Sequence, residues 1–187
     1  ARTSAGSWKS NEDAFLLSFL DTSAAFGCDD APVSIANPAT IAFGVYDGRG
    51  MYNDGDGATV SRVAAQEVHA SLVASKARGA QLGVSLVTAL VAANDALLRK
   101  NQADSRYLGC DSLATVTAFD RTSLFVAHVG DGCALLLRRT GWCLLSRSQT
   151  LQRLARDGGF DDADELPPKA LTASLGALPQ IAAVTSV

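Results

Sequence analysis

A carboxylate and a glycine stand directly after an apolar run in this chain, where they could bind a divalent cation. The run Phe43 to Tyr46 is apolar, and Asp47 and Gly48 follow it. We expect a strand that ends in an Asp-Gly turn, with the Asp47 carboxylate beside a glycine backbone that can approach an ion closely. Mg²⁺ and Mn²⁺ prefer carboxylate and carbonyl oxygens, so the Asp47 side chain and the Gly48 carbonyl are candidate ligands. A turn without a metal is the alternative, because Asp and Gly are common turn residues.

Hydrophobic patterning predicts the elements that position these residues. Apolar runs predict strands over 13–20, 40–46, 112–119, 122–130, 132–139 and 142–146, the last four forming an antiparallel meander. Apolar residues at helical spacing predict helices over 58–76 and 80–102, and a short helix over 149–157 that ends at Gly158-Gly159. Residues 21–39 are expected to form a loop. This order predicts an α+β fold in which helices pack on an antiparallel sheet.

The composition indicates a single globular domain over residues 1–187. Hydrophobic residues make up 48% and charged residues 19%, and the net charge is −3 without a long run of either sign. This balance does not indicate nucleic acid as a main partner, although a contact within a larger complex stays open, and it does not indicate a membrane. The cysteines Cys28, Cys110, Cys133 and Cys143 form no C-x-x-C pair. We expect small buried thiols in a reducing, intracellular compartment, and the Ala1 start is compatible with a cleaved organelle presequence.

Four segments follow one another in an order typical of one enzyme family. They are Asn-Glu-Asp-Ala at 11–14, Phe-Gly-Val-Tyr-Asp-Gly-Arg-Gly at 43–50, Phe-Val-Ala-His-Val-Gly-Asp-Gly at 125–132 and Leu-Thr-Ala-Ser-Leu-Gly at 171–176. Each motif is weak alone, but together they resemble the metal-dependent Ser/Thr protein phosphatases of the PP2C family. The resemblance runs essentially from end to end. It implies an antiparallel β-sandwich flanked by helical pairs.

The resemblance also implies roles for five residues. In that family two Mg²⁺ or Mn²⁺ ions activate a water that attacks a phosphoserine or phosphothreonine. Asp47 would bridge both ions and the Gly48 carbonyl would add a ligand, while Glu12 and Asp13 would hold metal-bound waters. Asp131 would lie near a looser third ion. The alternatives are that Glu12 and Asp13 are surface acids and that Asp131 is a turn residue.

Several positions depart from the family pattern. Trp8 stands where the family has a phosphate-gripping Arg, and a Trp cannot make a bidentate contact to phosphate. The neighbouring Lys9 is a weaker candidate for that contact. Arg49 stands where the family has a His that is thought to protonate the leaving alcohol, and an arginine does not cycle a proton at working pH. An Asp-His pair is replaced by Ser148-Gln149, and Ala173 replaces an Arg.

The later family motifs do not occur before Val187. Ser-Asp-Gly and Asp-Asn carry the remaining metal carboxylates in the family, on strands that complete the sandwich. We therefore expect the sandwich to be incomplete as given, with further polypeptide or a partner completing it.

Two functions remain open at this point. One is a pseudophosphatase, inactive or weakly active, that serves as a scaffold or regulatory binding module for a protein partner. The other is an active, divergent Mn²⁺- or Mg²⁺-dependent Ser/Thr phosphatase with phosphoprotein substrates, in which Arg49 would grip the phosphate. The first needs no metal, whereas the second needs one.

Overall fold

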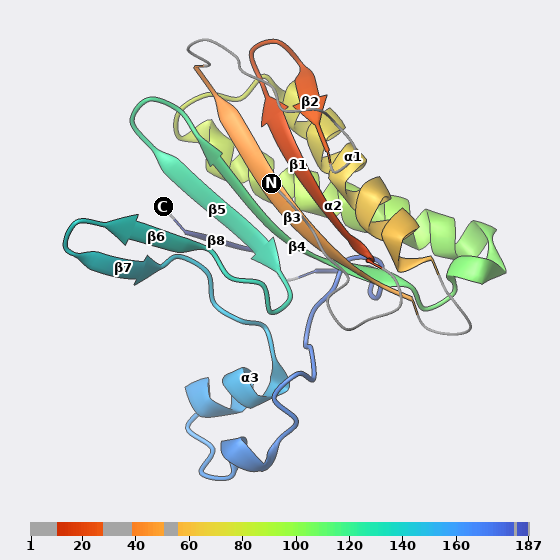
Figure 1. Cartoon of the computed structure of the whole chain (residues 1–187). Coiled ribbons are helices and arrows are strands. Elements are labelled where there is room, and N and C mark those ends of the chain that lie inside the picture. The colour runs from red at the N-terminus through yellow and green to blue at the C-terminus, as the bar shows by residue number, and fades with distance from the viewer. Residues whose placement is uncertain (1–10, 28–38, 51–55, 182, 187) are drawn as a thin grey trace.

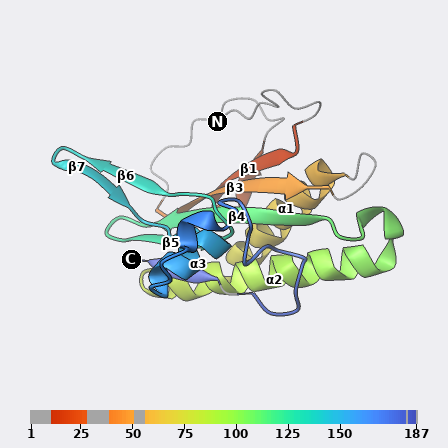
Figure 2. The ribbon, with the colours of Figure 1, turned by 90° about the horizontal axis from the view of Figure 1, so that it is seen from below.

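The computed structural model describes residues 11–27, 39–50, 56–181 and 183–186. Its main element is a six-stranded antiparallel sheet in the order β2-β1-β3-β4-β5-β8, with helices α1 and α2 on one face (Figures 1 and 2). The α+β class predicted from the sequence is confirmed. The strands and helices are β1 Asp13–Phe19, β2 Ala24–Phe26, β3 Ile41–Arg49, α1 Gly57–Ser75, α2 Gln81–Ala103, β4 Asp111–Phe119, β5 Leu124–Val129, β6 Leu135–Arg138, β7 Gly141–Leu144, α3 Leu151–Asp157 and β8 Val184–Ser186; short 3-10 turns cover Ser105–Tyr107 and Ala163–Glu165.

Strand β3 has two chemically different faces. Ala42, Gly44 and Tyr46 are buried against the helices, whereas the alternate residues Asp47 and Arg49 lie on the other face. The side-chain period of two in a strand produces this separation. Packing in the core therefore holds β3 in place, and the side chains on its opposite face remain accessible to a ligand.

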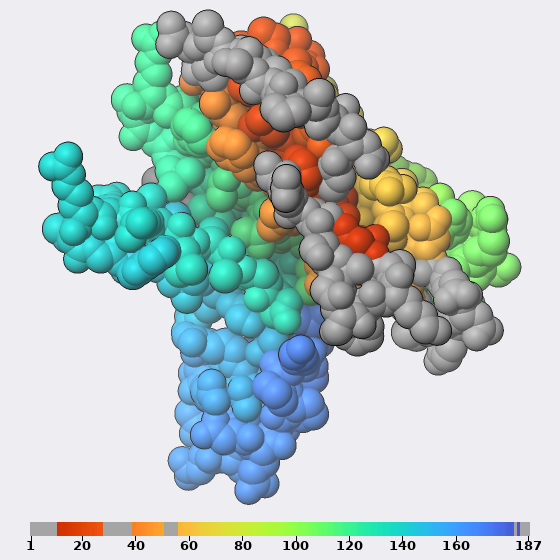
Figure 3. Space-filling model, in the orientation of Figure 1, coloured from red at the N-terminus to blue at the C-terminus, as the bar shows by residue number. Residues whose placement is uncertain are grey.

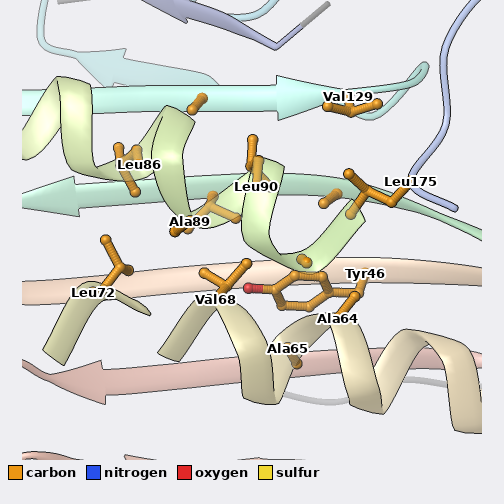
Figure 4. Close-up of a cluster of buried hydrophobic side chains, with 14 of the residues drawn as sticks. Tyr46, Ala64, Ala65, Val68, Leu72, Leu86, Ala89, Leu90, Val129 and Leu175 are labelled. Carbon is orange, nitrogen blue, oxygen red and sulfur yellow. The ribbon is translucent and has the colours of Figure 1, made fainter. Parts of the chain in front are cut away.

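The two long helices supply the core. The predicted stripe Val60, Ala64, Val68 and Leu72 of α1 is buried, and so are four leucines of α2, namely Leu82, Leu86, Leu90 and Leu97. Tyr46 points from β3 towards α1, where Ala64, Ala65 and Val68 lie around its ring (Figure 4). Both helices end within a residue of the predicted bounds, because the apolar stripe that defines them is a local pattern.

Helix α2 is unusually apolar for its length. Among the described residues it is the one helix long and apolar enough to cross a membrane. One face of the helix, however, packs on α1, β4 and β5, and Leu82, Leu86 and Leu90 on that face have no exposed surface. A core helix of a globular domain has the same features.

The predicted Asp-Gly turn is wrong. Strand β3 continues through Asp47 and Gly48 to Arg49, and these three residues pair with Leu113, Ser112 and Asp111 of β4. Pairing with the neighbouring strands overrides the local turn preference of Asp-Gly, since alternate residues of β3 form backbone hydrogen bonds to β4. The expected loop 21–39 also contains a short strand, β2, which pairs with β1.

The predicted four-strand meander is also wrong. Strands β4 and β5 pair, but β6 and β7 form a separate hairpin, and β8 takes the place beside β5. Gly130 follows β5 at a positive φ of 107°, which turns the chain away from the sheet. The hairpin stands out from the body of the molecule (Figure 3), and its Leu137 and Trp142 side chains are 62% and 70% exposed.

The cysteines differ in their environments. Cys110 is buried as expected, but Cys133 and Cys143 are exposed free thiols, and Cys28 lies outside the described residues. The expectation of buried thiols therefore fails for Cys133 and Cys143, because the segment that carries them leaves the sheet.

Candidate functional site

A cavity of about 370 Å³ lies on the face of the sheet opposite to the helices. The start of β1, the end of β3, the start of β4 and the bend after β5 surround it, and three of its lining residues are the carboxylates Asp13, Asp47 and Asp131. The sequence analysis proposed all three as metal-site residues. The fold thus brings together acids from three distant parts of the chain.

Asp13 and Asp47 are direct cross-strand partners in the β1–β3 ladder. Like charges in that position repel each other. The pKa of Asp47 is raised above its ordinary value, first by burial of the carboxyl and then by the negative charges of Asp13 and Asp131, while Arg49 acts in the opposite direction. A bound cation would relieve this repulsion.

The backbone of Gly48 is packed closely at the start of α1. Its N–H donates to the Glu12 carbonyl at 3.2 Å, and the Ser61 hydroxyl donates to the same carbonyl at 2.7 Å. A Cβ at Gly48 would lie 2.0 Å from the carbonyl oxygen of Gly57, so only glycine fits there. The sequence analysis assigned this glycine to an ion, whereas the structure shows that packing of β1, β3 and α1 already requires it.

Glu12 does not line the cavity. A Cβ at Gly57, the first residue of α1, would lie 2.6 Å from a Glu12 carboxylate oxygen, so this carboxylate is beside the helix N-terminus. A negative charge is favourable there because of the helix dipole. Its proposed role with a metal-bound water stays a prediction.

Arg49 forms a two-pronged ion pair with Asp111, its cross-strand partner on β4. Its Nε donates to Oδ1 at 2.7 Å, and its Nη2 donates to Oδ2. The hydroxyl of Ser174 donates to the same Asp111 Oδ2 at 2.7 Å. The bonds to Asp111 raise the pKa of Arg49 further, so the guanidinium keeps its proton. Among the described residues, the Arg49 side chain makes both of these hydrogen bonds to Asp111.

Sequence reasoning missed Asp111 and Ser174. Asp111 begins a strand and Ser174 lies in a motif noted for other residues, and nothing local in the sequence links either residue to Arg49. Only the β3–β4 register, across a separation of 62 residues, brings the pair together.

Gln149 supports the bend that carries Asp131. Its side-chain oxygen accepts from the Gly130 N–H at 2.8 Å, and its own N–H donates to the Gly130 carbonyl at 2.8 Å. Asp131 is thus both a bend residue and a lining residue of the cavity. Trp8 and Lys9 lie outside the described residues, so the phosphate contact proposed for Lys9 stays a prediction.

The cavity fits a divalent cation in charge but only in part in its ligand set. Clustered carboxylates are the donors that Mg²⁺ and Mn²⁺ prefer. Within the described segments, however, no three or more His, Cys, Asp or Glu side chains are placed to hold one ion together. The described residues therefore offer an acidic pocket rather than a complete metal centre.

Comparison with known proteins agrees with the motif analysis. The model of the family "Protein phosphatase 2C" matches residues 13–156. A comparison with curated protein sequences gave no match. A bacterial serine phosphatase structure superposes with a TM-score of 0.78 at 17% identity, covering 98% of this chain and 70% of that chain.

Two further structures show the same fold. Stp1, a serine/threonine phosphatase from Staphylococcus aureus, gives a TM-score of 0.77 at 16% identity over 98% of this chain and 68% of that chain. The phosphatase PstP/Ppp from Mycobacterium tuberculosis gives 0.59 at 21% identity over 84% of this chain and 70% of that chain. At these identities the likeness concerns the fold. Because the family match spans most of the chain, the protein belongs to the protein phosphatase 2C family.

Proposed function

We propose that this domain is a pseudophosphatase, with little or no turnover, that acts as a scaffold or regulatory binding module for a protein partner. The observation that carries the proposal is the Arg49–Asp111 ion pair, at the position where the family motif has a histidine. A general acid must release and regain a proton near working pH. Arg49 keeps its proton, and Asp111 engages two of its nitrogens, so it does not replace the histidine.

The ligand set supports the same proposal. Hydrolysis by two metals requires both ions to be fixed beside the attacking water and the phosphoryl group. The described residues provide Asp13, Asp47 and Asp131 around one cavity but no ready group of three ligands. A pocket of this kind can bind a cation weakly without assembling the complete reaction geometry.

The second candidate is an active, divergent Mn²⁺- or Mg²⁺-dependent Ser/Thr phosphatase. The convergence of three acids on one cavity favours it. Asp47 and the Gly48 carbonyl would then hold the cation, which would lower the pKa of a bound water. Asp13 and Glu12 would orient water, and Arg49 and Lys9 would contact the phosphate of a phosphoprotein. The active phosphatase would require Mg²⁺ or Mn²⁺ at the Asp47 pocket, whereas the pseudophosphatase could bind such a cation there without needing it.

A hydrolysis assay separates the two candidates. The purified protein is incubated with a phosphothreonine peptide and Mn²⁺, beside Asp47→Ala as the site control. We expect no turnover above that control, from samples whose folding is checked by circular dichroism. Clear turnover that Asp47→Ala abolishes would reject the pseudophosphatase proposal.

Two variants test the role of Arg49 within that assay. These variants apply if the protein hydrolyses the peptide. If Arg49 contacts the phosphate, Arg49→Ala will raise the KM for the peptide. Arg62→Ala removes the same charge from an exposed position on α1 and serves as the matched control. An unchanged KM in Arg49→Ala would exclude the phosphate contact.

A further inference from the structure

Arg49 and Asp47 are neighbours on one face of β3, with a single residue between them. Side chains in this relation point the same way from a strand. The guanidinium is half exposed, and in addition to Asp111 the acids Asp47 and Asp131 attract it electrostatically. A free arginine here would therefore be drawn towards the Asp47 carboxylate.

The structure instead directs Arg49 to Asp111. Both carboxylate oxygens of Asp111 accept from Arg49, which is the fork geometry that arginine forms best. Asp111 is itself held in place, because it is buried and its Oδ2 also accepts from the buried Ser174 hydroxyl at 2.7 Å. The position of the guanidinium is thus set by a fixed carboxylate on the neighbouring strand.

Ser174 is anchored in turn by its own segment. The neighbouring Leu175 exchanges two backbone hydrogen bonds with Ser112, of 3.0 and 2.8 Å, and its side chain has no exposed surface. Asp111 cannot follow Arg49 towards the pocket without breaking these contacts. The contacts of Asp111 and Ser174 therefore keep the Arg49 guanidinium away from the Asp47 pocket.

We propose that Asp111 is a positioning residue of the pocket: it holds Arg49 off Asp47 and so leaves the Asp47 carboxylate free to bind a divalent cation. An Arg49–Asp47 pair would occupy the carboxylate oxygens and remove a negative charge from the pocket. The proposal rests on cation binding at the pocket named under Proposed function, and it does not require turnover.

Titration calorimetry with MnCl₂ alone tests the proposal. Asp111→Asn leaves Arg49 charged but removes its anchor, so we expect Mn²⁺ affinity to fall about tenfold or more, as one released charge moves close to the ligand. The double variant Asp111→Asn/Arg49→Met removes that charge and restores the affinity of Arg49→Met alone. Asp47→Ala abolishes binding and places the ion in this pocket.

A second pair of variants leaves Asp111 intact and protects the test from misfolding. Arg49→Lys keeps the charge but cannot form the fork, whereas Arg49→Met removes the charge. We expect Arg49→Lys to bind Mn²⁺ several-fold more weakly than Arg49→Met. A cooperative thermal unfolding transition in the absence of metal shows that each variant is folded, although Arg49→Met melts at a lower temperature because Asp111 loses its partner.

Three outcomes would overturn the proposal. They are wild-type protein that binds no Mn²⁺, equal affinity in Arg49→Lys and Arg49→Met, and a double variant as weak as Asp111→Asn. The last outcome would mean that Asp111 affects Mn²⁺ binding by contacting the ion or by supporting the fold, and not by positioning Arg49. Because the readout is binding, a failure here is distinct from the phosphatase assay, which reports on turnover.

Discussion

Asp13 and Asp47 face each other across strands β1 and β3, and both line the same cavity. This pair of like charges does not stabilise the fold, since directly opposed carboxylates destabilise a sheet. It is the arrangement expected where a fold keeps acids together for a cation.

Asp13→Asn should therefore stabilise the metal-free protein. We expect the free energy of unfolding to rise by roughly 0.2–1 kcal/mol, with a smaller gain in high salt, because the removed repulsion is partly screened by solvent. Urea denaturation measures the change, and Asp95→Asn, at an exposed position of α2, is the control. The pKa of Asp47 should fall towards its ordinary value in the variant, since the Asp13 charge helps to raise it. A loss of stability in Asp13→Asn would contradict this account.

Tyr46→Phe should also stabilise the domain. The Tyr46 side chain is buried in the core, and its hydroxyl has no hydrogen-bond partner in the part of the chain that the structure describes. Burial raises the pKa of this phenol strongly. Removing an unpartnered buried hydroxyl recovers its desolvation penalty, about 1 kcal/mol or more. We expect a higher urea midpoint in Tyr46→Phe.

Tyr107→Phe provides the comparison for that substitution. Tyr107 also belongs to the core, at 9% exposure, but among the described residues its hydroxyl is not a buried group without a partner. Lys100 lies over its ring at 3.8 Å, a contact that phenylalanine keeps. Its stability should change little. Equal effects in the two variants would show that the buried hydroxyl of Tyr46 carries no special cost.

Asn94→Ala should loosen the segment that carries Ser174. Asn94 lies on α2, accepts from the Gly176 N–H at 2.8 Å, and donates to the Leu178 carbonyl at 3.0 Å. The variant leaves both backbone groups without their side-chain partner, at a cost of about 1–3 kcal/mol. We expect faster cleavage by a protease after residue 170 than in the wild type. Thr88→Ala, at an exposed position of the same helix, should leave the cleavage pattern unchanged.

Stability should fall in mild acid because both histidines of the chain have lowered pKa values. Burial lowers the pKa of His128, whose Nε2 accepts from the Arg147 N–H, and it also lowers the pKa of His69. A histidine with a depressed pKa stays neutral when folded but takes up a proton near pH 6.5 when unfolded. The contribution of the neutral histidines to the free energy of unfolding is therefore complete above pH 6.5, and it decreases as the pH falls towards their folded-state pKa.

His128→Gln measures how much His128 contributes to this loss of stability in acid. The unfolding free energy between pH 7.5 and pH 5.5 should depend less on pH in this variant than in the wild type, and His69→Gln gives the corresponding share of His69. Unchanged slopes in both variants would assign the acid sensitivity to the carboxylates instead.

The sequence alone determined the parts of the fold that depend on local patterns. The stripe on α1 and the apolar run of β3 follow from side-chain periodicity, which a single segment contains. Asp13, Asp47 and Asp131 were found because short motifs contain them, and the structure places all three at one cavity.

Tertiary structure alone decided the features that depend on pairing between distant segments. Pairing with β4 converts the expected Asp-Gly turn into strand, and the positive φ of Gly130 directs the chain of β6 and β7 away from the sheet. The Arg49–Asp111 pair arises from the register of β3 against β4, across 62 residues of sequence. A register sets every cross-strand contact at once, and no local pattern specifies which distant residue will stand opposite another.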